Sequence, residues 1–309
     1  MDLENETSPD LINHLRKSAF PADGLVLVFS LFLMIVGILN YTRLGQPSTW
    51  ISTDCGVIVI LLMLIYRENR DPQRPYYWLH FLWPVLSMAF IYSQCAAWDN
   101  LIFRHPFDPV LIKWDSGLFG TELNRIMAPA ANSLWLDEMM HALYFSYYLM
   151  LFLPAAWMLW RRKPQAFELV FSLVLMLYIH ILFFMIFPSD GPISERNNLF
   201  GRGVFFIPLM NLIYSISEQN GGGAFPSTHV SSAVLIFLYT IKYAPRLRIP
   251  SGIACGGIVL ATVYCSYHYA IDSVAGIVTG TLFFFVGQYI YARWRHPSEA
   301  PSLAVQQSV

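Results

Sequence analysis

The stretch QAFELVFSLVLMLYIHILFFMIF, residues 165–187, is apolar along almost its whole length. A helix needs about 20 predominantly apolar residues to cross the hydrocarbon core of a bilayer, so this stretch predicts a transmembrane helix. The rest of the chain has the same character, since 56% of its 309 residues are hydrophobic and 13% are charged. A soluble domain carries about 25% charged residues. The sequence therefore predicts an integral membrane protein of the all-α class.

Seven further apolar stretches can cross the membrane, which predicts a polytopic helical bundle of about eight transmembrane helices. The first stretch lacks a small-residue exit site, so we interpret it as a retained helix and not as a cleaved signal peptide. The second is short and the last two are joined by a tight turn, so a count of seven or nine stays open. The predicted spans are residues 24–41, 53–66, 76–98, 133–160, 165–187, 227–244, 251–268 and 272–292.

The basic residues predict the orientation of these helices. If the connections alternate between the two sides, 13 of the 19 Lys and Arg residues lie on one side and 6 on the other. Cytoplasmic loops carry an excess of Lys and Arg, so the richer side, which includes both termini, is predicted to be cytoplasmic. The net charge is −1, so no overall basic character indicates a nucleic-acid partner.

The chain is expected to have three parts. Residues 1–98 hold the first three predicted spans, and residues 99–292 hold the other five with every motif described below. The residues from Pro297 onward are small and polar, and residues 293–309 are predicted to form a disordered cytoplasmic tail. Two connections on the outer side, 99–132 and 188–226, mix apolar and charged residues without a full span. Each is either an interfacial helix beside an outward-facing pocket or a simple amphipathic connector.

The segment GGGAFPSTHVSS, residues 221–232, leads from a glycine-rich loop into the sixth predicted span. Glycines such as Gly223 let the backbone approach a ligand closely. Ser227 or Thr228 can cap the helix, whose free N–H groups form a natural phosphate site. His229, in the first turn, can protonate a leaving oxygen. The alternative is an ordinary loop-to-helix entry with a surface histidine.

The segment YCSYHYAIDSVAG, residues 264–276, carries His268 and Asp272. A spacing of four would place both side chains on one helical face, where a carboxylate can orient an imidazole and make it a stronger nucleophile. The predicted topology brings His229, His268 and Asp272 to the same outer face of the membrane, where titratable groups indicate a functional site. The alternative is a structural pair that closes a tight turn.

Two arginines follow the fifth predicted span, in FPSDGPISERNNLFGRG, residues 187–203. Guanidinium groups bind phosphate through forked hydrogen bonds, so Arg196 or Arg202 is a candidate phosphate clamp. The alternative for each is an exposed loop arginine.

Three blocks, FPSDGP, AFPSTHVSS and HYAIDSVAG, resemble the signature motifs of the type-2 phosphatidic acid phosphatase (PAP2) superfamily. Within it, they are most similar to the inositolphosphotransferase branch, which includes inositol phosphorylceramide synthase. The segment WDSGLFG, residues 114–120, also resembles an element of that branch. The resemblance implies that His268 attacks phosphorus to form a phosphohistidine, that Asp272 orients His268, and that His229 protonates the departing alkoxide. Water or a second alcohol would then accept the phosphoryl group.

Two cations that the superfamily motifs normally carry are missing. The lysine and the Arg-Pro pair of the first motif have no counterpart, and Thr262 stands where the third motif normally has an arginine. Their loss is typical of the transferase-like branch. Arg196, Arg202 or backbone groups would then have to hold the phosphate.

The expected function is that of a lipid phosphatase or phosphotransferase at the periplasmic or luminal face, with a phospholipid or sphingolipid substrate and no cofactor. A non-catalytic lipid carrier or scramblase on the same scaffold is the alternative. A metal held by His229, His268 and Asp272 is conceivable, but we favour the metal-free scheme because it uses each residue. The oligomeric state stays open.

His141 and His180, inside two spans, either have a function or donate to helix backbone.

Overall fold

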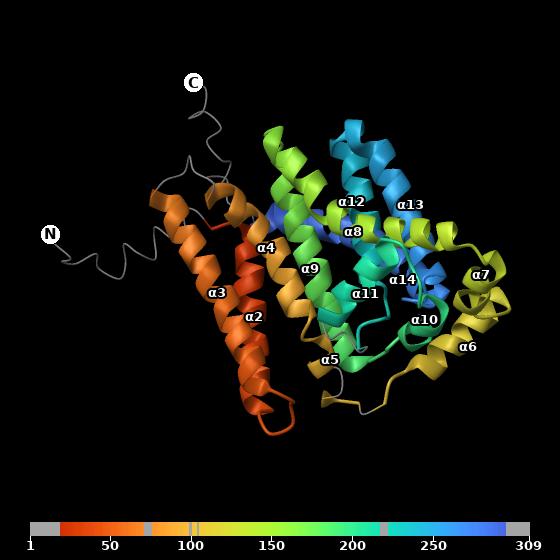
Figure 1. Ribbon diagram of the computed structural model, residues 1–309. Helices are drawn as coiled ribbons and strands as arrows, with labels where there is room; N and C mark the ends of the chain where they lie inside the picture. Colours follow the sequence, from red (N-terminus) through yellow and green to blue (C-terminus); the bar gives the residue numbers. More distant parts are fainter. Residues whose placement is uncertain (1–18, 71–75, 99–100, 104, 217–221, 295–309) are drawn as a thin grey trace, which may run out of the picture.

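The computed structural model describes residues 19–70, 76–98, 101–103, 105–216 and 222–294, and every regular element within them is helical (Figure 1). The predicted all-α class is therefore confirmed. The elements are α2 (Pro21–Leu39), α3 (Pro47–Arg70), α4 (Tyr76–Tyr92), α5 (Cys95–Trp98), α6 (Asp108–Phe119), α7 (Leu123–Ala131), α8 (Leu134–Trp160), α9 (Gln165–Ile186), α10 (Ile193–Leu199), α11 (Phe206–Ile216), α12 (Thr228–Tyr243), the 3₁₀ helix η2 (Pro245–Leu247), α13 (Arg248–Tyr264) and α14 (Ala270–Trp294).

Six of the described helices are long and apolar enough to cross a membrane: α2, α3, α8, α9, α13 together with η2, and α14. The other two predicted spans are also helical, but α4 has 17 residues and α12 has 16. Each is therefore about 25 Å long, which is short of a hydrocarbon core of about 30 Å. The protein is a multi-pass membrane protein, and the predicted count of eight spans is not confirmed.

Helix α9 lies at the centre of the bundle, where it contacts α2, α4, α8, α12 and α14. Its most apolar window is 72% buried inside the protein, a larger share than for any other candidate span. A helix surrounded by other helices has no polar face to present, which explains its nearly continuous apolar sequence.

Glycines allow α14 to pack closely on α12. A Cβ atom at Gly276 would lie 2.8 Å from the Val230 Cβ and 2.9 Å from the Ser227 carbonyl oxygen. Both distances are shorter than van der Waals contact, so the small residue is needed for this approach. This close approach of α14 to α12 also bears on the position of His229, because Ser227 caps the helix that carries it.

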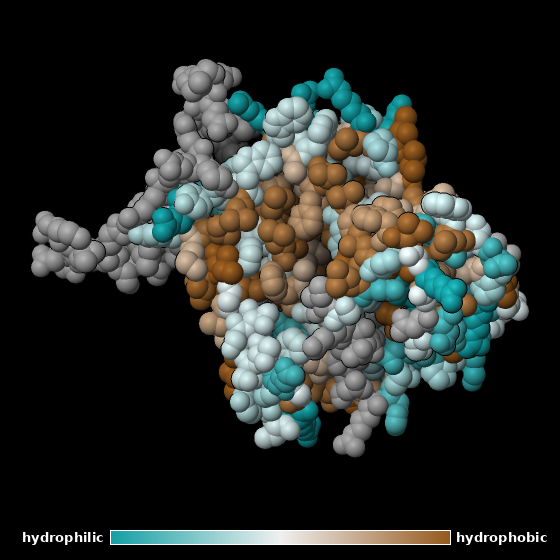
Figure 2. All heavy atoms as spheres, viewed as in Figure 1, coloured by the Kyte–Doolittle hydropathy of each residue, from teal (hydrophilic) through white to brown (hydrophobic). Residues whose placement is uncertain are grey.

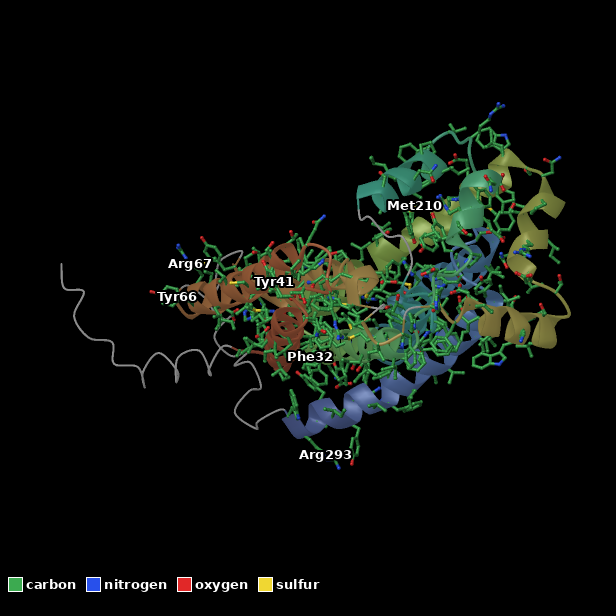
Figure 3. The ribbon with its side chains drawn as sticks, turned by 90° about the horizontal axis from the view of Figure 1, so that it is seen from below. Phe32, Tyr41, Tyr66, Arg67, Met210 and Arg293 are labelled. Atoms are coloured by element: carbon green, nitrogen blue, oxygen red, sulfur yellow. The ribbon has the colours of Figure 1, made fainter. Side chains whose placement is uncertain are left out.

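The remaining helices cover opposite sides of this centre. In Figure 1, α2 and α3 stand at one side of the bundle, and α6 and α7 at the other. The view from below places Met210 of α11 and Arg293 of α14 on opposite flanks, with side chains filling the space between the helices (Figure 3). On the face shown in Figure 2, hydrophobic residues gather across the middle and hydrophilic residues at the top and lower edge. This pattern suits a protein whose middle faces lipid tails.

A buried ionic cluster joins the three N-terminal helices. The His80 ring on α4 bonds Asp23 Oδ2 on α2 through Nε2, at 2.9 Å, and Glu68 Oε2 on α3 through Nδ1. The exposed fractions of Asp23, Glu68 and His80 are 3%, 8% and 0%. Because each ring nitrogen meets a carboxylate oxygen and a neutral imidazole donates only once, either the ring or one carboxyl group holds an extra proton.

Several predicted boundaries were wrong. The span predicted at 76–98 is broken, because α4 ends at Tyr92 and the backbone N–H of Gln94 bonds the Ile91 carbonyl in a tighter turn before α5 begins. The connections predicted at 99–132 and 188–226 contain, in their described parts, only helices too short to span, as expected. Residues 293 and 294, which were predicted to belong to the disordered tail, are the last two residues of α14, and the rest of the predicted tail lies outside the described residues.

Candidate active site

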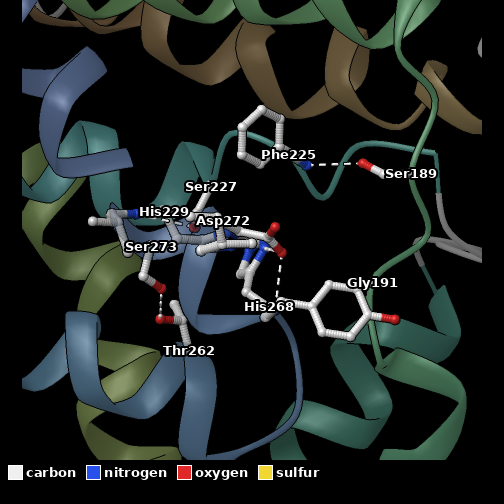
Figure 4. Close-up of polar contacts among 12 residues, drawn as sticks. Ser189, Gly191, Phe225, Ser227, His229, Thr262, His268, Asp272 and Ser273 are labelled. Atoms are coloured by element: carbon white, nitrogen blue, oxygen red, sulfur yellow. Dashed lines mark hydrogen bonds and ion pairs between the residues drawn. The ribbon is translucent and has the colours of Figure 1, made fainter. Parts of the chain in front are cut away.

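Three loops that are far apart in the sequence meet at one end of α9 and α12. The Ala224 N–H donates to the Ser189 carbonyl at 3.0 Å, and the Phe225 N–H donates to the Ser189 hydroxyl at 3.0 Å (Figure 4). The Ser227 N–H donates to the Asp272 carbonyl at 3.1 Å. The loops that carry the three sequence motifs are thus held together by backbone hydrogen bonds, and the predicted convergence of His229, His268 and Asp272 is present.

His229 lies in the first turn of α12, and Ser227 caps that helix. The Ser227 hydroxyl accepts from the Val230 N–H at 3.4 Å, as the sequence predicted for Ser227 or Thr228. The rings of His229 and His268 are 5.7 Å apart, centroid to centroid. The two imidazoles are therefore close enough to contact one phosphate group between them.

His268 does not lie on a helix, which corrects the prediction that it shares a helical face with Asp272. Helix α13 ends at Tyr264, and Ser266 adopts a positive φ of 55°, which a continuing helix cannot accommodate. The His268 N–H donates to the Thr262 carbonyl at 3.0 Å. This turn directs the ring toward α14, where His268 Nδ1 lies 3.4 Å from Asp272 Oδ2 (Figure 4).

Asp272 is fully buried in the first turn of α14. Besides facing His268, its Oδ2 accepts the Tyr269 N–H at 2.9 Å, whereas its Oδ1 has no partner among the described residues. A buried carboxylate next to an imidazole orients the ring and stabilises its cationic form. Because Nδ1 faces Asp272, Nε2 is the His268 nitrogen available to a ligand.

Both imidazoles line a cavity of about 40 Å³, which we call the histidine pocket. One water molecule needs about 10–15 Å³, so the pocket holds a few waters or a compact polar headgroup, and lipid chains must lie outside it. No lysine or arginine is among the described residues that line it. The other residues that face it include Tyr92, Asp190, Tyr214, Gly223 and Tyr267.

Gly223 lies against the pocket wall with little room for a side chain. Its carbonyl accepts the Tyr92 hydroxyl at 3.2 Å, and a Cβ atom there would lie 3.2 Å from that hydroxyl. The neighbouring Gly222 has φ of 90°, a left-handed backbone conformation that favours glycine. Thr228, also predicted to bind phosphate, is 2% exposed at the start of α12.

The two candidate arginines differ sharply. Arg196 of α10 is 3% exposed, and its guanidinium carbon lies 4.7 Å from the centre of the Tyr267 ring, which lines the pocket. Its Nη2 donates to His141 Nε2 at 3.3 Å, while its Nε has no partner among the described residues. Arg202 is exposed in the loop before α11. Arg196 therefore lies behind the pocket wall, and Arg202 does not.

The two histidines predicted inside spans have separate environments. His141 Nδ1 donates to the Asp137 carbonyl of its own helix at 2.7 Å, which leaves Nε2 to accept from Arg196. Neither ring nitrogen of His180 has a partner among the described residues, and this side chain packs near Phe184 and Phe283. His141 thus supports an arginine beside the site, whereas His180 belongs to the core.

Sequence reasoning gave no definite role to the aspartates that hold the motif loops. Asp108, at the start of α6, accepts the N–H groups of Asp190 at 2.9 Å and Gly191 at 2.7 Å. Asp115, on the same helix, accepts the Ile271 N–H at 2.8 Å, one residue before Asp272. The available sequence signal for this role was the presence of two acidic residues in a segment that was expected to lie at the membrane interface.

Burial and neighbouring charge act on two of these carboxyl groups. Burial raises the pKa of Asp115, and its backbone N–H donors partly oppose that change. Burial also raises the pKa of Asp190, and the negative charge of Asp108 raises it further. Asp190 Oδ1 accepts the Gly222 N–H at 3.0 Å, so this pocket residue also joins the first motif loop to the second.

Sequence reasoning missed Tyr144 altogether. Its hydroxyl lies 2.9 Å from His229 Nε2 and 2.6 Å from the Tyr214 hydroxyl. Nothing in the sequence pattern of α8 distinguishes Tyr144 from Tyr147 and Tyr148, because all three lie in the same largely apolar and aromatic stretch of the helix. Within the described part of the chain, no group of three or more His, Cys, Asp or Glu side chains is arranged to hold a metal ion.

The fold and the site together define a multi-pass helical membrane protein with a carboxylate-backed histidine facing a second histidine in a small pocket. A model of the PAP2 superfamily matches residues 110–286, more than half of the chain, so this protein belongs to the PAP2 superfamily. A PA-phosphatase related-family protein from Dictyostelium discoideum is 25% identical over 211 residues, which are 59% of this chain and 38% of that relative. The chain thus spans about two fifths of the relative's length. No solved structure matches.

Proposed function

We propose that this protein is an integral membrane lipid phosphatase or phosphotransferase that works through a phosphohistidine on His268. The observation that carries the proposal is the position of His229 and His268 on one small pocket, with ring centroids 5.7 Å apart and Asp272 behind His268. Membership of the PAP2 superfamily, whose name refers to phosphatidic acid phosphatases, agrees with a phosphate-bearing lipid as substrate.

The proposed reaction has two steps. His268 Nε2 attacks phosphorus, the bond from phosphorus to the lipid oxygen breaks, and His229 gives its proton to that oxygen. Water or a second alcohol then attacks the phosphohistidine and returns a proton to His229, and the phosphoryl group leaves His268. Asp272 stabilises the imidazolium form of His268 throughout.

The N-terminus of α12 is the proposed phosphate cradle. Free N–H groups and the positive end of the helix dipole favour an anion there, close to Gly223, Ser227 and Thr228. Arg196, behind Tyr267, would add positive charge at short range, and its unpartnered Nε supports this role. The exposed position of Arg202 makes it the weaker candidate.

The site is proposed to face the periplasm or lumen, with both termini in the cytoplasm. This orientation rests on the excess of basic residues in the loops on the other side. Because the pocket admits only a compact headgroup, lipid chains would stay in the bilayer or at the interface. The scarcity of cations at the described pocket residues supports a transferase like those of the inositolphosphotransferase branch over a simple hydrolase.

The test is the fate of phosphorus on His268. Purified wild-type protein is incubated with a panel of ³²P-labelled phospholipids and phosphosphingolipids, quenched in alkali and probed for acid-labile phosphoprotein, free phosphate and new lipid products. H268A is expected to lose the phosphoprotein and to reduce turnover by about 10³-fold or more, because it lacks the nucleophile. H105A, which removes an exposed histidine, is the control and should keep both.

The products decide between the remaining possibilities. Free phosphate indicates a hydrolase, and a new phospholipid that requires an added alcohol indicates a transferase. Full turnover by H268A would contradict the mechanism. Stoichiometric lipid binding without turnover by the wild-type protein would favour a non-catalytic lipid carrier or scramblase.

A further inference from the structure

The two imidazoles of the histidine pocket are supported by different chemical groups. His268 Nδ1 faces the carboxylate of Asp272. His229 Nε2 instead meets a neutral phenol, the hydroxyl of Tyr144, at 2.9 Å. A carboxylate adds a negative charge beside an imidazole and a phenol does not, so the two contacts suit different chemical roles.

Tyr144 is held firmly in place. Its side chain is fully buried, its ring stacks on Tyr267 at 4.0 Å between centroids, and its hydroxyl lies 2.6 Å from the Tyr214 hydroxyl. Tyr214 in turn stacks on Tyr267 at 4.8 Å. The hydroxyl that touches His229 therefore cannot turn away without disturbing three packed rings.

This contact decides which nitrogen of His229 is free. Nε2 is occupied by Tyr144, whereas Nδ1 is buried and has no partner among the described residues. His229 as a whole is only 8% exposed and lines the pocket. A buried nitrogen without a partner is costly unless a ligand supplies one, and with Nε2 held by Tyr144, Nδ1 is the nitrogen of His229 left for a ligand.

We infer that Tyr144 is a positioning residue, which holds His229 by Nε2 so that Nδ1 exchanges the proton with the leaving and attacking oxygens. This inference rests on the proposed function. In the first step, the proton on Nδ1 moves to the lipid oxygen as its bond to phosphorus breaks, while the Nε2 proton stays hydrogen-bonded to Tyr144. In the second step, Nδ1 takes the proton of the attacking water or alcohol, so no net proton is gained or lost.

The different partners then explain the different roles. The carboxylate behind His268 favours the cation that forms when this ring bonds phosphorus. The phenol behind His229 orients the ring without adding a charge, so the ring releases its proton more readily. Tyr144 and Tyr214 lie on α8 and α11, outside the three motif segments.

The test compares two leaving groups in Y144F. A general acid matters most when the leaving oxygen is a poor leaving group, and such catalysis contributes about 10²–10⁴-fold. With dioctanoyl phosphatidate, whose leaving group is an alkoxide, Y144F is expected to lose about 10- to 100-fold in kcat/KM, which reports the steps up to departure of the leaving group. With p-nitrophenyl phosphate, whose phenoxide leaves unprotonated, it should lose less than about 3-fold. H229A should show the same split, and Y148F, on the same helix, is the control.

Each other outcome has a definite meaning. Equal losses of Y144F in kcat/KM on both substrates would show a structural role and overturn the inference, as would wild-type kcat/KM on both. If H229A shows the split and Y144F does not, the inference fails and the proposed function stands. If the wild-type protein forms no phosphohistidine and turns over neither substrate, the proposed function fails and the inference with it.

Discussion

At the residue scale, Asp108 links a helix outside the motifs to the first motif loop. Its two oxygens accept the N–H groups of Asp190 and Gly191. In that loop, Gly191 has φ of 73° and lies against Tyr267. A Cβ atom at Gly191 would lie 3.1 Å from the Tyr267 carbonyl oxygen. The loop in turn holds Ala224 through the Ser189 carbonyl. One carboxylate therefore supports two of the three segments of the site.

Replacing Asp108 by alanine should both destabilise the protein and reduce activity. Two backbone N–H groups would lose their acceptor, which we expect to lower the free energy of unfolding by about 1–3 kcal/mol. D108N keeps one acceptor oxygen and should lose less. Thermal unfolding in detergent and kcat/KM for the best lipid substrate measure the two effects. Wild-type stability and activity in D108A would contradict this role.

At the element scale, the position of α12 depends on how closely α14 approaches it. Gly276 of α14 lies against Val230 and the carbonyl of Ser227, the residue that caps α12. Because His229 is in the first turn of α12, a shift of that turn moves His229 relative to His268. The packing of α14 on α12 thus also sets the geometry of the site.

The variants G276A and G256A should have opposite effects. Alanine at Gly276 would force α12 and α14 apart, at a cost of about 1–3 kcal/mol, and should lower kcat as well. A Cβ atom at Gly256 of α13 would have no neighbour within 4 Å, so alanine there should stabilise the helix by up to about 1 kcal/mol. Thermal unfolding of both proteins is the measurement, and destabilisation of equal size would refute the packing argument.

At the scale of the whole molecule, the N-terminal helices are joined by charge as well as by apolar packing. His80 connects Asp23 of α2 to Glu68 of α3, and all three residues precede residues 110–286, which match the family model. A buried charge without a partner is strongly unfavourable. The cluster therefore ties the three helices into one unit beside the part of the chain that matches the family.

Replacing His80 by leucine should loosen this unit. Removing one member of a buried ionic cluster typically costs about 3–5 kcal/mol, because the other charges stay buried without a partner. The triple variant D23N/E68Q/H80L removes those charges and should recover part of the loss. Thermal unfolding and limited proteolysis of the N-terminal helices are the measurements, and equal stability of H80L and wild type would contradict the argument.

The sequence predicted the fold class and the convergence of His229, His268 and Asp272, but the expectation of a shared helical face for His268 and Asp272 was wrong. His268 was expected on the same helical face as Asp272, and it lies instead in the turn after α13. The two side chains still meet, because Ser266 reverses the chain with a positive φ. A spacing of four residues fits a helical face as well as the tight turn predicted between the last two spans, and only the structure shows that the turn makes the contact.

Local pattern determined what short stretches of this chain become. Apolar runs predicted the helices, Ser227 and Thr228 were the two candidates for the cap of α12, and the residue types of the motifs indicated phosphoryl chemistry. Only the tertiary structure decided that Tyr144 supports His229, that Asp108 holds the Asp190 loop, and that Arg196 lies behind the pocket while Arg202 is exposed. These contacts join residues that are far apart in the sequence or depend on burial, and no sequence spacing encodes them. They arise from the way the helices pack.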